Sequence, residues 1–73
     1  MGFSNRSTSD LVQIVANGGG LILDAGARPE VDLVQIAANA AGKCTVTMLG
    51  MELRTTAELA RIAANGKGSV IFG

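Results

Sequence analysis

Apolar residues recur along this chain at helical spacing in three separate stretches. In each stretch they occupy positions i, i+3 and i+4, which places them on one stripe of a short helix. The three sets are Leu11, Ile14 and Val15; Leu33, Ile36 and Ala37; and Leu59, Ile62 and Ala63. The pattern therefore predicts three amphipathic helices, each with one buried side.

Polar residues predict where these helices begin. Ser7 with Asp10, and Thr55 with Glu58, have the spacing of capping boxes, in which a hydroxyl and an acidic side chain satisfy free main-chain N–H groups. Pro29 fits the first turn of the second helix, because the N–H that proline lacks is not needed there. We expect the helices to begin close to these residues.

Each helix is followed by a glycine and then by a short apolar run, which indicates a strand. The runs are LIL at 21–23, KCTVTML at 43–49 and SVIF at 69–72. In the middle run Cys44, Val46 and Met48 alternate with threonines, so one face is buried and the other is more exposed. Strands joined through helices run parallel. We expect an α/β fold with a parallel three-stranded sheet in the order 1-2-3 and the helices on one face.

The three helix–strand segments also share a common sequence. IVANGGG at 14–20, IAANAAG at 36–42 and IAANGKG at 62–68 are near copies of one another, and flanking Arg and Leu positions align with them. Repetition with a period of about 20–50 residues indicates stacked supersecondary units. We therefore expect a single domain, residues 1–73, made of three repeats at 6–27, 28–53 and 54–73.

The recurring pattern L-x-x-I-A-x-x-G followed by V-x-L-x-G is similar to that of short bacterial helix–strand repeat proteins. The expected arrangement resembles leucine-rich-repeat-like solenoids, and this resemblance implies a stack of units that bury a continuous core. The chain departs from the leucine-rich pattern in two ways. Its asparagines stand at the helix ends, and LIL and VTML keep the L-x-L strand pattern only in part.

Arginine occupies the same position in each repeat, as Arg6, Arg28 and Arg54, and each arginine stands four residues before an acidic residue. One interpretation is a charged rim that sets the register between stacked units, both within and across chains. The other is a solvated helix edge, where an exposed ion pair contributes about 0.2–1 kcal/mol.

Asparagine recurs in the same way, as Asn17, Asn39 and Asn65. Each asparagine can end its helix by adopting a left-handed conformation. Alternatively, each side-chain amide can bond to the main chain of the next unit, so that the three amides form an internal ladder.

The ends of the expected stack carry apolar residues where solenoids usually have polar caps. The last strand has neither proline nor an inward-facing charge to protect its edge. The candidate residues for an interface between copies of the chain are Leu11, Ile14, Val70, Ile71 and Phe72.

Two modes of association are open to such ends. Copies can join head to tail, because Gly73 ends a repeat in the phase in which Gly2 begins one. They can also pack face to face through the side of the sheet opposite the helices.

Composition and charge narrow the class of partner. The chain is 48% hydrophobic and 16% charged, too apolar for disorder, yet no apolar run reaches the roughly 18 residues needed to span a bilayer. Six basic and six acidic side chains give no net charge, and the two aromatic residues are Phe3 and Phe72. We therefore expect neither nucleic acid nor membrane as a partner. The single Cys44 and the absence of a secretory signal predict a cytoplasmic protein.

Catalytic and cofactor chemistry has little support in the sequence. The chain has no His, and Cys44 has no second cysteine, so nucleophilic triads and zinc sites are excluded and no cofactor is expected. We expect Cys44 to be a small core residue. NGGGL at 17–21 follows a helix instead of opening one, so it does not match a phosphate-binding loop. Asp24, near Gly26 at the end of the first strand, is the acid best placed for function, with turn formation as the alternative.

The sequence thus predicts a non-enzymatic, self-associating repeat protein that serves as a structural or scaffold module. One alternative is an adaptor whose edge strand SVIF accepts a strand from another protein. The other is a small enzyme with a pocket at an oligomer interface near Asp24 and Gly26.

Overall fold

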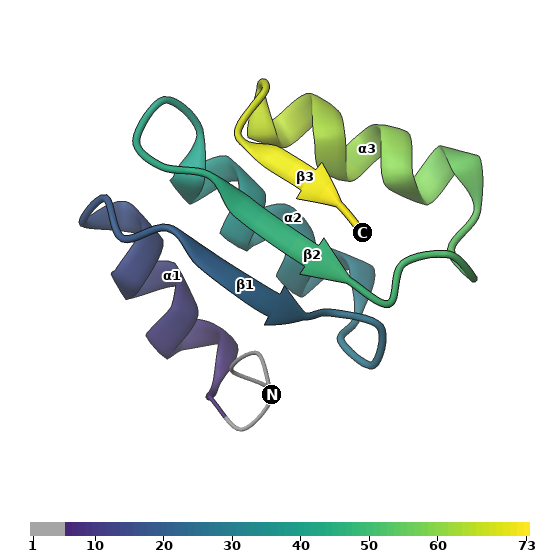
Figure 1. Ribbon diagram of the computed structural model, residues 1–73, viewed down its shortest axis with the longest axis horizontal. Helices are drawn as coiled ribbons and strands as arrows, with labels where there is room; N and C mark the ends of the chain where they lie inside the picture. Colours follow the sequence, from purple (N-terminus) through teal and green to yellow (C-terminus); the bar gives the residue numbers. More distant parts are fainter. Residues whose placement is uncertain (1–5) are drawn as a thin grey trace.

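Helices and strands alternate along the chain in the computed structural model, which describes residues 6–73 (Figure 1). The elements are α1 Thr8–Ala16, β1 Leu21–Asp24, α2 Glu30–Ala40, β2 Val46–Leu49, α3 Thr56–Gly66 and β3 Val70–Phe72. The predicted α/β class is confirmed, and each of the three aligned sequence segments contains one helix followed by one strand. Gly2 and Phe3 lie outside the described residues.

The three strands form one parallel sheet in the order β1-β2-β3, as predicted. Leu21 pairs with Val46, and Val46 pairs with Val70, so the strands are aligned near their amino ends. Figure 1 views the molecule from the sheet side, with α2 behind the strands and α1 and α3 on either side of it. The helices therefore cover one face of the sheet.

Alternation along the strands separates a core face from an open face. Leu21, Leu23, Val46 and Met48 point toward the helices and are buried. The residues between them belong to the uncovered face, where Ile22 is 57% exposed. Burial of one face explains why the register is fixed, because a shift by one residue would expose the whole buried set.

Of the two predicted capping boxes, only the one at α3 is complete. The Ser7 hydroxyl accepts a hydrogen bond from the N–H of Asp10 at 3.2 Å. Thr55 and Glu58 form a complete capping box, in which the Glu58 carboxylate accepts from the Thr55 N–H at 3.0 Å and the Thr55 hydroxyl accepts from the Glu58 N–H at 3.2 Å. Pro29 precedes α2 as its N-cap. Side-chain hydrogen bonds thus cap α1 and α3, whereas α2 begins after Pro29 without one.

The left-handed conformation and the ladder predicted for the asparagines are wrong, although Asn17 is the C-cap residue of α1. Each side-chain amide donates a 2.8 Å hydrogen bond to the carbonyl four residues earlier in its own helix: Asn17 to Gln13, Asn39 to Gln35 and Asn65 to Arg61. The left-handed conformations are adopted by residues beyond the asparagines, among them Gly18, Gly42, Lys67 and Gly68. A carbonyl one helical turn away is the nearest acceptor, so the amides close their own helices and form no ladder between segments.

Candidate interaction surface

Arginine side chains link each helix–strand segment to the one before it. The Arg54 guanidinium donates to the main-chain carbonyl of Arg28, and it lies 3.4 Å from the carbonyls of Ala25 and Gly26. The Arg28 guanidinium in turn donates to the carbonyl of Arg6. An arginine therefore reaches the main chain of the equivalent arginine at both internal junctions.

The expected arginine–carboxylate pairs form only in part. Arg54 pairs with Glu58 at 3.3 Å. Arg28 instead donates to the hydroxyl of Thr8 at 2.9 Å, and that hydroxyl donates to the Asp32 carboxylate at 3.1 Å. Thr8 is the first residue of α1, so the arginine, the threonine and the aspartate join the starts of α1 and α2.

A further ion pair joins α2 to α3. The Arg61 guanidinium donates to the Glu30 carboxylate at 3.0 Å. This bond lowers the pKa of Glu30 below its ordinary value of 4.5 and raises the pKa of Arg61. The pKa of Glu58 is also lowered, mainly by the hydrogen bond from the Thr55 main chain.

Equivalent apolar residues differ in burial according to their position in the series. Leu11 and Leu33 are fully buried, whereas Leu59 in α3 is only partly buried. The isoleucines show the opposite order, because Ile36 and Ile62 are fully buried and Ile14 in α1 is partly exposed. Full burial of the leucine thus coincides with the presence of a following segment, and full burial of the isoleucine with the presence of a preceding one.

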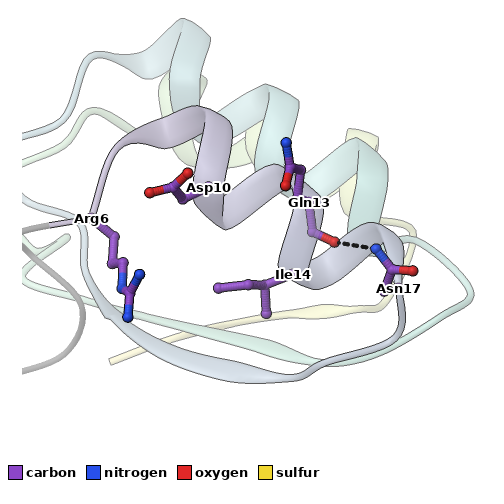
Figure 2. Close-up of a pocket in the computed structure, with 5 residues that line it drawn as sticks. All are labelled: Arg6, Asp10, Gln13, Ile14 and Asn17. Atoms are coloured by element: carbon purple, nitrogen blue, oxygen red, sulfur yellow. Dashed lines mark hydrogen bonds between the residues drawn. The ribbon is translucent and has the colours of Figure 1, made fainter.

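The outer side of α1 carries a hollow of about 330 Å³, which we call the α1 end surface. Figure 2 views it with the other helices behind α1, and shows the side chains of Arg6 and Ile14 between α1 and β1. The lining residues are Arg6, Asp10, Gln13, Ile14 and Asn17. Arg6 and Asp10 are exposed, and Arg6 is not ion-paired within residues 6–73. This surface therefore combines one apolar side chain with charged and amide groups.

The opposite end of the molecule carries a smaller and more apolar hollow of about 180 Å³, which we call the α3 end surface. It is lined by Met51, Glu52, Leu59, Phe72 and Gly73. The exposed Thr56 begins α3 at this end of the series. No arginine side chain within residues 6–73 donates to the carbonyl of Arg54.

The predicted interface residues are divided among four places. Leu11 lies in the core of the chain with no exposed surface, so its expected place at an interface is incorrect. The reason is that Leu11 belongs to the buried core cluster, and α1 packs against α2. Ile14 lies on the α1 end surface, and Phe72 on the α3 end surface. Val70 is partly buried against the core, and Ile71 lies on the open sheet face, 52% exposed.

The open sheet face also carries exposed apolar residues. Strand pairing places Ile22, Thr47 and Ile71 in one row across the sheet, and Asp24 lies beside Leu49 in the next row. No helix covers this row in Figure 1.

A third hollow, of about 480 Å³, lies at the carboxyl ends of the strands. It is lined by Gly26, Gly50, Leu53, Arg54 and Glu58, and Asp24 is not among these residues. Its two charged groups already bond to each other. Cys44 packs partly buried against the core, with its Sγ atom 3.6 Å from the Val15 carbonyl. Within residues 6–73, no cluster of three acidic or cysteine side chains is arranged to hold a metal ion.

Sequence reasoning missed the polar contacts that join neighbouring helices. Thr8, Asp32 and the Glu30–Arg61 pair could not be recognised from local spacing, because their partners lie 20 or more residues apart in sequence. The buried Ser69 was missed as well; its hydroxyl accepts from the Gly42 N–H at 3.2 Å. The available signal was the alignment of the three segments, which places Thr8, Glu30 and Thr56 at one common position.

None of the helices described in residues 6–73 has the length and apolar character needed to cross a membrane. No protein-family model, curated protein or solved structure matches this chain.

Proposed function

We propose that this chain is a non-enzymatic structural module that assembles from copies of itself. In this assembly the α3 end surface of one copy packs against the α1 end surface of the next. The contact continues the stack of helix–strand segments from one chain into another, and strand β3 lies beside strand β1 of the following copy.

The observation that supports this proposal is the difference in burial between equivalent residues. Ile36 and Ile62, which have a preceding segment, are fully buried, as are Leu11 and Leu33, which have a following one. Ile14 and Leu59 lack such a neighbour and keep part of their surface exposed. Joining the two end surfaces would cover both Ile14 and Leu59, and burial of apolar surface contributes about 25 cal/mol per Å².

The two end surfaces are different from each other, so their contact is heterologous. Such contacts leave one surface of each kind at the ends of an open filament, or none in a closed ring. Pairing between open sheet faces would instead be symmetric and would end at a dimer. The adaptor alternative would leave the purified chain monomeric until a foreign strand is supplied.

The proposal is tested by light scattering on the purified chain up to about 1 mM, where an association of about 4 kcal/mol is detectable. The expected result is a particle mass that rises with concentration to multiples of 7.4 kDa. A mass of 7.4 kDa throughout would contradict self-association.

Single substitutions identify the surface involved. Leu59→Glu and Ile14→Glu, at opposite ends, should each weaken assembly, because a carboxylate is costly to bury without a partner. Ile22→Glu on the open sheet face is the matched control and should have little effect. The reverse pattern would indicate face-to-face pairing. Circular dichroism of each variant confirms that the monomer is folded.

A further inference from the structure

The junction between α1 and α2 supplies a template for the contact between copies. At this junction the Thr8 hydroxyl accepts from Arg28 and donates to Asp32, while Arg28 also reaches the carbonyl of Arg6. An arginine and an aspartate from the second segment thus meet a threonine from the first.

The same three residue types occur in the first and last helix–strand segments. Thr56 occupies the position of Thr8, as the first residue of its helix. Arg6 and Asp10 stand four residues apart, as Arg28 and Asp32 do. All three end residues, Arg6, Asp10 and Thr56, are exposed.

The intervening junction between α2 and α3 does not have this composition. Position 30 carries a glutamate instead of threonine, and Glu30 bonds to Arg61. Glu58, at the position of Asp32, bonds to Arg54 and Thr55. Within one chain, the threonine–aspartate–arginine combination therefore occurs only at the junction between α1 and α2. It would recur where α3 of one copy meets α1 of the next.

We propose that Thr56 of one copy binds Arg6 and Asp10 of the next, and that this polar contact fixes the head-to-tail orientation of the assembly. The Thr56 hydroxyl donates to the Asp10 carboxylate and accepts from the Arg6 guanidinium. Arg6 also donates to the carbonyl of Arg54, as Arg28 does to the carbonyl of Arg6. This inference rests on the proposed self-association.

The contact discriminates between orientations because its two halves differ. One half is a neutral hydroxyl with a main-chain carbonyl, and the other is a guanidinium beside a carboxylate. Two α1 end surfaces brought together would offer Arg6 and Asp10 neither the Thr56 hydroxyl nor the Arg54 carbonyl, and they would leave Leu59 and Phe72 uncovered. Two α3 end surfaces would leave the Thr56 hydroxyls without charged partners.

The strands then continue in the established register. Leu21 pairs with Val46 and Val46 with Val70, so the next pairing places Val70 beside Leu21 of the following copy. Phe72 lies beside Leu23 of that copy, on the core face. The apolar and polar parts of the junction are therefore compatible with one arrangement.

The first test compares two isosteric substitutions in the associating chain. Thr56→Val removes the proposed hydroxyl, and Thr47→Val makes the same change on the open sheet face. Thr56→Val should raise the dissociation constant about 10- to 150-fold, since a hydrogen bond to a charged group contributes about 1.5–3 kcal/mol. Thr47→Val should change it less than about twofold. Unchanged association of Thr56→Val would overturn the polar contact while leaving self-association intact.

The second test measures orientation by disulfide cross-linking with oxidised glutathione. Asp10→Cys and Thr56→Cys are prepared separately in a Cys44→Ala background and then mixed. The expected product is the mixed dimer, and cross-linking of either variant with itself would overturn the head-to-tail orientation. The double variant Thr8→Cys with Asp32→Cys is the matched control, because those side chains are already 3.1 Å apart within one chain.

Discussion

The guanidinium of Arg54 donates a hydrogen bond to the main-chain carbonyl of Arg28, which is the equivalent residue of the preceding helix–strand segment. The side chain of Arg54 is only 13% exposed at this junction. The bond connects two loops that are 26 residues apart in sequence, so it depends on the packing of the segments and in turn supports it.

Removal of this link should lower the stability of the fold. Arg54→Gln is expected to reduce the free energy of unfolding by about 1.5–3 kcal/mol, because the accepting carbonyls lose a charged donor. Urea denaturation at a concentration where the chain is monomeric measures the change. Arg6→Gln is the control and should cost less than about 0.5 kcal/mol, as expected for an exposed side chain. Equal losses in the two variants would show that the link to the Arg28 carbonyl contributes nothing particular.

Truncation of equivalent leucines should have unequal effects. Leu33→Ala is expected to lower the free energy of unfolding by about 2–5 kcal/mol, because it leaves a cavity in place of a fully buried side chain. Leu59→Ala should cost clearly less in the monomer, since Leu59 is only partly buried. In the assembled chain the cost of Leu59→Ala should rise toward that of Leu33→Ala. A cost for Leu59→Ala that does not depend on protein concentration would argue against burial of Leu59 by a second copy.

Stability should fall in acid through Glu30 and Glu58. Both carboxyl groups have a pKa below the ordinary value of 4.5 in the folded chain, so the unfolded chain binds protons more readily. Their contribution is fully present above pH 4.5 and is lost as the pH falls through the lowered values. The measurement is the thermal midpoint against pH. Glu58→Gln should flatten this dependence, whereas Glu52→Gln, which alters an exposed carboxylate that makes no ion pair within residues 6–73, should leave it unchanged.

Local sequence predicted the elements because short-range forces decide them. Ser7 and Thr55 begin helices through hydrogen bonds that span three residues. The alternation of Val46 and Met48 with threonine identified the buried face of β2, and the parallel order followed from the helical connections. These features need no knowledge of distant partners.

The prediction of side-chain partners was less successful, and Arg28 shows why. Its spacing to Asp32 favoured a direct ion pair, but the structure places the Thr8 hydroxyl between the two groups. For the asparagines a bond to the next segment was considered, but the side-chain amide of Asn39 donates to a carbonyl within its own helix. A polar side chain bonds to whichever group packing brings closest, and spacing along the chain ranks only the local candidates.

The sequence by itself determined the alternation of helices and strands, the buried face of the central strand and the parallel order of the sheet, since these depend on periodicity and on the lengths of connections. Only the tertiary structure decided that Leu11 lies inside while Ile14 and Leu59 remain at the two ends. The physical reason is that equivalent residues acquire different surroundings once the segments are packed, because the first segment and the last each have a neighbour on one side alone.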